Sequence, residues 1–166
     1  MIHSKLPSVG TSTFAVMSQM AQEHNAINLS QGFPDFPVSE YLIDLVTKYM
    51  KAGFNQYAPM PGLLDLRIAV ANKIGRLYGA QYNPETEINI TAGATQAIST
   101  AIAAFVNEGD EVLVFEPAYD AYVPSIKLNG AKPVFVQMSV PAFTIDWEQV
   151  KKVINAQTKM IIINSP

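Results

Sequence analysis

The sequence predicts an α/β fold with a mostly parallel sheet and helices on both faces. From residue 87 onward, short β-prone runs alternate with helical runs, which is the pattern of βαβ units. Two of these runs, "VLVF" at 112–115 and "MIII" at 160–163, are continuously apolar, as expected of strands covered on both faces. The chain is 49% hydrophobic and only 15% charged, which indicates a large buried sheet or a surface that other protein covers.

The first half of the chain predicts three helices separated by irregular segments. The first helix covers about 13–24, with Thr13 as its N-cap and an apolar face that includes Phe14. Two prolines and a glycine then exclude helix from the segment that precedes Ser39. The remaining helices of this half span 40–52, capped by Ser39, and 63–79, which ends at its own glycine.

The second half of the chain predicts the sheet and the helices that cover it. Right-handed crossovers are expected between successive parallel strands. The strands are predicted at 87–91, 111–115, 132–137 and 159–164, and the helices at about 95–106, 119–128 and 146–156.

Composition excludes several classes of function. A net charge of −3 gives no electrostatic basis for binding nucleic acid or an anionic membrane. There is no apolar run of transmembrane length, and the absence of cysteine excludes disulfides and indicates a cytoplasmic protein. The two histidines, His3 and His24, have no partner at metal-ligand spacing, so no metal site is predicted.

A turn without reactive side chains joins the predicted strand at 87–91 to the helix that follows. Gly93 permits a tight turn, and Ala94 leaves the start of the helix sterically open. The N–H groups of the first helical turn, with the Thr95 hydroxyl, would form a cradle for an anion at the carboxyl edge of the sheet. A phosphate monoester fits such a cradle. The alternative is an ordinary turn in which Thr95 is only an N-cap, and neither nucleotide-binding glycine pattern is present.

Aromatic residues follow the predicted strand at 111–115. In "FEPAYDAY" Tyr119 and Tyr122 flank an aspartate at the same rim of the sheet as Thr95. A tyrosine there can stack on a planar heteroaromatic ring, or it can simply pack into the core at a helix start. Tyr57 lies in an irregular loop and Gly32 in a proline-rich segment, and neither indicates a function by itself.

Taken in series, five segments resemble the fold-type I, pyridoxal-phosphate-dependent aminotransferases of class I/II. They are "NLSQGFPDFP", "QYAPMPGLLDLR", "TAGATQAI", "EGDEVLVFEPAYDAY" and the closing "INSP". The resemblance is greatest to the kynurenine, glutamine and methionine aminotransferase group, and "SKLPSVGTSTFAVMSQMA" is similar to bacterial members of that group. It implies that residues 37–166 are the first, truncated part of the large cofactor-binding domain, and that 1–36 are an N-terminal arm of the small domain.

The resemblance implies roles for residues at matching positions. Gly93, Ala94 and Thr95 would hold the phosphate of pyridoxal 5'-phosphate, and Tyr119 would lie on its pyridine ring. Tyr57 would reach across a homodimer to the phosphate bound by the partner subunit.

On the substrate side, the resemblance implies that Gly32 lines the pocket for the substrate carboxylate, with Phe14 nearby. The family's lysine that bonds to the cofactor, its aspartate beside the pyridine nitrogen and its carboxylate-binding arginine all match positions beyond residue 166. No catalytic residue is therefore expected in this chain, which we expect to be inactive and poorly soluble when it is produced alone.

The implied function is an aminotransferase that moves an amino group from a hydrophobic, aromatic or sulfur-containing amino acid, such as methionine, to a 2-oxo acid. One alternative is a β-lyase that cleaves C–S bonds with the same fold and cofactor. The other is a non-catalytic α/β module that binds a different phosphate through the turn at Gly93, or binds nothing.

Overall fold

The computed structural model describes residues 3–32 and 34–165, which form two compact units. One unit comprises Phe14–Thr91, and the other comprises the chain from Ala92 onward together with the N-terminal residues up to Thr13. Phe33 of the "QGFPDFP" segment and Pro166 of the closing "INSP" lie outside the described residues. No helix within the described residues is long and apolar enough to cross a membrane.

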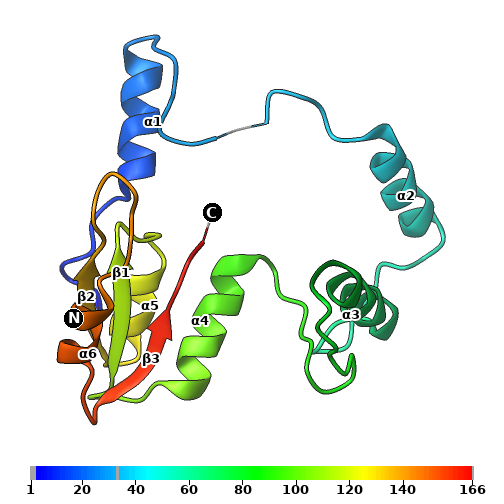
Figure 1. Cartoon of the computed structure of the whole chain (residues 1–166). Helices are drawn as coiled ribbons and strands as arrows, with labels where there is room; N and C mark the ends of the chain where they lie inside the picture. The colour runs from blue at the N-terminus through cyan, green and yellow to red at the C-terminus, as the bar shows by residue number, and fades with distance from the viewer. Residues whose placement is uncertain (1–2, 33, 166) are drawn as a thin grey trace. The chain divides into compact units, whose positions relative to one another are not determined.

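The second unit is an α/β structure with a three-stranded parallel sheet (Figure 1). The strand order is β2-β1-β3, so that β1 is central and both of its neighbours run parallel to it. This confirms the predicted fold class. In chain order the elements are α4 (Ala94–Phe105), β1 (Glu111–Glu116), α5 (Tyr122–Leu128), β2 (Lys132–Gln137), α6 (Trp147–Val153) and β3 (Thr158–Ile162).

Helices cover both faces of the central strand, as the apolar run "VLVF" predicts. All four residues of that run are buried, and successive side chains point to opposite faces. One face packs against α4 and α5, and the other packs against α6, with Val136 of the neighbouring strand β2 on that same face. The buried residues of the first cluster include Val112, Val114, Ile102 and Ile126, and those of the second are Leu113, Phe115, Val136 and Val150.

The prediction that "MIII" is buried on both faces is wrong. Along β3 the side chains alternate between intermediate and exposed, and Ile161 is 41% exposed. The reason is position in the sheet, because β3 lies at an edge: Met160 and Ile162 pack against the first buried cluster, whereas Ile161 points to the other face. The β3 strand also ends at Ile162, two residues before the predicted end.

The predicted strand at 87–91 is also absent. The backbone there has no neighbouring strand and bonds to loops instead: Glu87 N–H donates to the Asn83 carbonyl, and Ile90 N–H donates to the Pro61 carbonyl. A β-prone sequence forms a strand only where another strand supplies the ladder of hydrogen bonds.

Two helix ends also differ from the prediction: α5 begins at Tyr122 after a turn, and α6 ends at Val153.

The first unit contains the three helices expected in this half of the chain. They are α1 (Thr13–Glu23), α2 (Glu40–Lys51) and α3 (Leu64–Tyr78). Ser39 is the N-cap residue of α2, although its side chain makes no capping hydrogen bond, and Gly79 ends α3 in the left-handed conformation. Thr13 is the first residue of α1 and not its N-cap, so the helix begins one residue earlier than predicted.

Arg67 ties α3 to the loops on either side of it. The side chain is buried, and it donates from Nε to the Gly62 carbonyl and from one terminal nitrogen to the carbonyls of Pro84 and Glu85. The loop that ends at Gly62 is thereby joined to the segment before Ile90. A guanidinium suits this position because it donates several bonds in a fixed geometry and never loses its charge.

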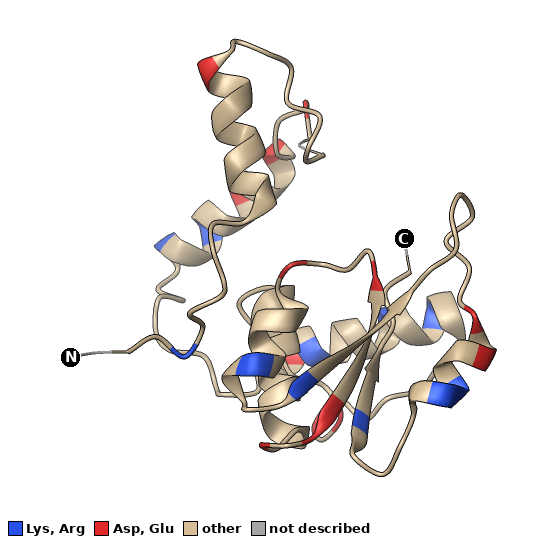
Figure 2. Cartoon of the chain, turned by 90° about the vertical axis from the view of Figure 1, so that its left-hand side faces the viewer, with Lys and Arg blue, Asp and Glu red and all other residues tan. Residues whose placement is uncertain are grey.

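At the amino-terminal end of the sheet, Glu111 of β1 makes an ion pair with Lys132 of β2. Figure 2 colours the positions of the charged residues along the chain. Its carboxylate accepts hydrogen bonds from Lys132 Nζ and from Asn155 Nδ2, each at 2.8 Å. The hydrogen bond from Lys132 is the main cause, followed by that from Asn155, of a pKa of Glu111 below its ordinary value of 4.5.

We expect this ion pair to make stability depend on pH on the acid side. Because the folded-state pKa of Glu111 is lowered, its contribution is complete above pH 4.5 and is lost as the pH falls through the folded value. Glu111→Gln will therefore flatten the acid limb of the curve of unfolding midpoint against pH, measured in urea. Glu148→Gln, at the exposed pair with Lys151, is the control and will leave that limb unchanged.

Candidate active site

The turn that precedes α4 has a backbone conformation that only glycine adopts readily. Gly93 is the N-cap residue, with φ of 96° and ψ of 167°. Ala92 N–H donates to the Gln96 side-chain oxygen at 2.5 Å, which fixes the entry of the chain into the helix. The first N–H groups of an α-helix find no acceptor within the helix, so the turn at Ala94 and Thr95 directs donors outward at the positive end of the helix dipole.

Thr95 and Tyr119 meet beside this turn although 24 residues separate them in the sequence. The two hydroxyl oxygens lie 3.4 Å apart, and both side chains are exposed. The Tyr119 ring in turn packs edge-to-face on Tyr122, with ring centroids 5.7 Å apart and an interplanar angle of 75°. Tyr122 is buried, so one tyrosine anchors the second, whose ring remains accessible.

A pocket of about 300 Å³ opens beside these tyrosines, at the carboxyl ends of all three strands. Its wall is mainly apolar, and Tyr122 belongs to it. The other lining residues are Phe115, Pro117, Ala118, Met138, Phe143, Ile162 and Asn164. In open α/β sheets, ligands bind at this edge, outside the carboxyl ends of the strands.

The donors at the start of α4 fit a phosphate group. Backbone N–H groups, the Thr95 hydroxyl and a helix of 12 residues provide neutral hydrogen bonds and a positive partial charge, which is the chemistry that anion cradles use. A Cβ added at Gly93 would meet no atom within 4 Å, so the space in front of the turn is open. The described residues include no group of three His, Asp or Glu side chains that could hold a metal ion.

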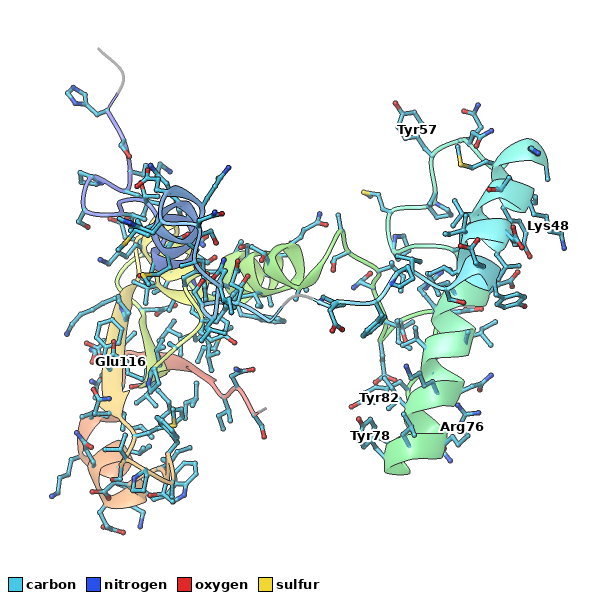
Figure 3. All side chains as sticks on the ribbon, turned by 90° about the horizontal axis from the view of Figure 1, so that it is seen from above. Lys48, Tyr57, Arg76, Tyr78, Tyr82 and Glu116 are labelled. Carbon is cyan, nitrogen blue, oxygen red and sulfur yellow. The ribbon has the colours of Figure 1, made fainter. Side chains whose placement is uncertain are left out.

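The predicted site residues are divided between the two units. Gly93, Ala94, Thr95 and Tyr119 lie in the α/β unit, whereas Tyr57, Gly32 and Phe14 belong to the helical unit. Tyr57 is fully exposed at 102% and projects from its loop (Figure 3). Gly32 is exposed as well, and Phe14 is half-buried in α1.

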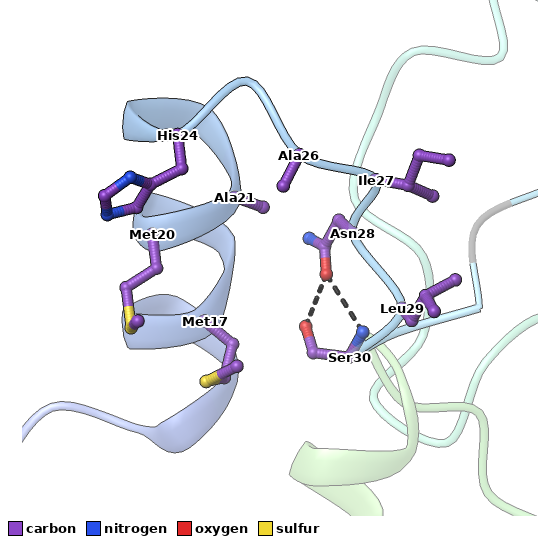
Figure 4. A pocket seen from close by; sticks show the side chains of 9 residues that line it. All are labelled: Met17, Met20, Ala21, His24, Ala26, Ile27, Asn28, Leu29 and Ser30. Atoms are coloured by element: carbon purple, nitrogen blue, oxygen red, sulfur yellow. Dashed lines mark hydrogen bonds between the residues drawn. The ribbon is translucent and has the colours of Figure 1, made fainter.

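The helical unit has a pocket of its own, of about 420 Å³, between α1 and the extended segment that follows it (Figure 4). Met17, Met20 and Ile27 give it an apolar wall. Its polar lining residues are His24, Asn28 and Ser30, of which Asn28 accepts from the backbone and hydroxyl of Ser30 and donates from its amide to Ser18 of α1. Such a pocket offers no grouping of polar side chains for catalysis.

Sequence reasoning missed the polar contact between α4 and α5. Ser99 and Ser125 lie 26 residues apart, and their hydroxyl oxygens are 2.8 Å apart. One signal was present, because Ser99 follows Thr95 by four residues and therefore shares its face of the helix. Nothing in the sequence identified Ser125 as the partner.

The α/β unit thus combines a three-stranded parallel sheet with a glycine turn at the start of α4 and an exposed tyrosine beside that turn. Residues 24–166 match the family described as Aminotransferase class I and II. The chain belongs to this family, whose members use pyridoxal 5'-phosphate.

The relatives include several aminotransferases. The chain is 46% identical to the methionine aminotransferase of Escherichia coli and 34% identical to a kynurenine–oxoglutarate transaminase of Dictyostelium discoideum, over 98% and 96% of its length. These matches span only 42% and 40% of the relatives' own lengths.

The solved structures agree with the sequence relatives. An Escherichia coli protein described as having a methionine aminotransferase function matches with a TM-score of 0.92 and 45% identity, over 97% of this chain and 42% of that one. The N-succinyldiaminopimelate aminotransferase of Mycobacterium tuberculosis matches with a TM-score of 0.93 and 38% identity, over 100% and 44%. The fold therefore matches the N-terminal part of the aminotransferase fold.

Proposed function

We propose that the protein transfers an amino group from a hydrophobic, aromatic or sulfur-containing amino acid, with methionine as the leading candidate, to a 2-oxo acid. The observation that carries this proposal is the meeting of Thr95 and Tyr119 at the start of α4, in a chain 46% identical to a methionine aminotransferase. Pyridoxal 5'-phosphate, when bound, supplies the electron sink that makes the substrate α-proton acidic. The residues of this chain bind and orient the cofactor.

The start of α4 holds the cofactor phosphate. The N–H groups of Ala94 and Thr95 donate to phosphate oxygens, the Thr95 hydroxyl donates a further bond, and Gly93 lets the backbone approach closely. The helix dipole favours the dianion by about 1 kcal/mol. Tyr119 supplies an aromatic face for the pyridine ring, held in place by Tyr122 beneath it.

On the substrate side, Gly32 lines the pocket for the substrate carboxylate, with Phe14 nearby. Tyr57 acts across a homodimer, where its hydroxyl donates to the phosphate bound by the partner subunit. Its complete exposure within one chain is consistent with an interface position. In the assembled enzyme, residues 1–36 form an arm of the small domain and 37–166 the first part of the large domain.

Two assays on the protein produced from its complete coding sequence test this proposal. The first follows the visible absorbance band that appears when apoprotein binds pyridoxal 5'-phosphate. The second follows conversion of methionine and a 2-oxo acid into a new amino acid and the 2-oxo acid of methionine. We expect both signals, and we expect no activity from residues 1–166 alone.

The alternatives give different results in the same assays. A C–S β-lyase would bind the cofactor but release ammonia and a 2-oxo acid from a sulfur-containing amino acid without forming a new amino acid. A non-catalytic module would give no absorbance band. Either result would overturn the proposed reaction.

A further inference from the structure

The strongest unexplained feature near the site is a chain of hydrogen bonds that connects α4 to the turn between Tyr119 and Tyr122. Ser125 is only 5% exposed, and its hydroxyl lies 2.7 Å from the carbonyl oxygen of Ala121. The Ser99 hydroxyl lies 2.8 Å from that of Ser125. A serine hydroxyl has one hydrogen to donate. Since Ser125 donates to Ala121, it must accept from Ser99, which fixes the direction of the chain.

Each end of this chain lies next to a residue of the proposed cofactor site. Ser99 follows Thr95 by four residues, which is about one turn of helix along the same face. Ala121 lies between Tyr119 and Tyr122, whose rings are in contact. The bond between Thr95 and Tyr119 and the bond between the two serines are therefore two cross-links between the same pair of segments, about one helical turn apart.

The two cross-links differ in how firmly they hold. The outer one is a long contact of 3.4 Å between exposed hydroxyls, which water can replace. The inner one is short and partly buried, and breaking it would leave a buried hydroxyl without its donor. The inner pair therefore sets the separation of α4 from the turn that carries Tyr119.

We infer that Ser99 and Ser125 are positioning residues for cofactor binding, which fix the distance between the phosphate cradle on α4 and the ring-binding face of Tyr119. This inference rests on the proposed function, because it assigns the separation to a cofactor with a phosphate at one end and an aromatic ring at the other. Neither serine contacts the cofactor.

Two variants at one position test this inference in the protein from the complete coding sequence. Ser99→Thr keeps the hydroxyl. Ser99→Val introduces a side chain of the same shape as threonine but without a hydroxyl. We expect Ser99→Thr to bind pyridoxal 5'-phosphate within about twofold of wild type, and Ser99→Val to bind about tenfold more weakly, or about 1.4 kcal/mol. The visible circular dichroism of the bound cofactor, which reports the orientation of its ring, should also change in Ser99→Val but not in Ser99→Thr.

Thr100→Val is the matched control, because it removes a hydroxyl from the exposed neighbouring position on the same helix. It should leave both the affinity and the dichroism unchanged. If Ser99→Val does not fold, the smaller Ser99→Ala and Ser125→Ala take its place, with the same expected loss.

The outcomes separate the inference from the proposed function. If wild type binds the cofactor and the Val and Thr variants have equal affinity and dichroism, the positioning role is overturned and the proposed function stands. A lower unfolding temperature of Ser99→Val with unchanged affinity and dichroism would also overturn it, because the pair would then be purely structural. If wild type binds no cofactor, the proposed function fails and the inference fails with it.

Discussion

Gly93→Ala will weaken the binding of pyridoxal 5'-phosphate about 100-fold, which corresponds to about 2.8 kcal/mol. The φ of 96° and ψ of 167° at Gly93 belong to a region that residues with a Cβ almost never occupy, and holding one there costs about 1–3 kcal/mol. The added methyl group meets no atom, so the effect comes from the backbone alone. The turn will relax, and the N–H groups of Ala94 and Thr95 will no longer converge on one anion.

Gly109→Ala is the matched control for Gly93→Ala. Gly109 also has a positive φ, of 87°, and an added Cβ there also meets nothing within 4 Å. It precedes β1, at the opposite end of the strand from the proposed site. We expect the control to lower stability while the cofactor affinity stays within about twofold of wild type. Equal loss of affinity in both variants, measured by titration of the apoprotein, would contradict a specific role for the turn at Gly93.

Gly62→Ala will lower the free energy of unfolding by about 3 kcal/mol. Gly62 is buried with φ of 94°, and a Cβ there would lie 2.5 Å from Cγ1 and 2.7 Å from Cβ of Ile90. Left-handed backbone costs a residue with a Cβ about 1–2 kcal/mol, and overpacking a filled site adds about 1–3 kcal/mol. The atoms that clash are close to the Ile90 backbone, and that residue donates its N–H to Pro61, so it cannot move aside easily.

Gly53→Ala separates the two contributions to this loss. Gly53 has φ of 88°, close to that of Gly62, but open space surrounds its added Cβ. Urea unfolding should show a loss of about 1 kcal/mol for Gly53→Ala, from backbone strain alone. If the two variants lose the same amount, the close approach of Gly62 to Ile90 does not contribute to stability.

The elements that the sequence predicted correctly are those with a strong local signal. The continuous apolar run at 112–115 identified the buried central strand, and the cap at Ser39 and the stop at Gly79 marked helix ends. The wrong predictions depended on partners that are distant in the sequence. The segment 87–91 has strand-forming residues but no neighbouring strand, and "MIII" lies at an edge that its own composition does not reveal.

The candidate site likewise has features that local sequence predicts and features that depend on contacts between distant segments. The turn at Gly93 could be predicted because a glycine between a β-prone run and a helical run marks a tight turn. The distance between Thr95 and Tyr119 follows only from how α4 packs beside the segment before α5. The pairing of Ser99 with Ser125 also depends on how α4 packs beside α5. Nothing in the sequence indicates that two serines 26 residues apart are in contact.

The central claim is that the start of α4 binds the phosphate of the cofactor. It is tested most directly by comparing how wild type and Thr95→Val bind pyridoxal 5'-phosphate and pyridoxal, which lacks the phosphate. Calorimetric titration of the apoprotein should give wild type an affinity about 100-fold higher for the phosphorylated form. Thr95→Val should lose about tenfold of the affinity for that form and none of the affinity for pyridoxal, in keeping with about 1.4 kcal/mol for one charge-assisted hydrogen bond. Equal affinities of wild type for the two compounds, or an equal loss of both in Thr95→Val, would contradict the claim.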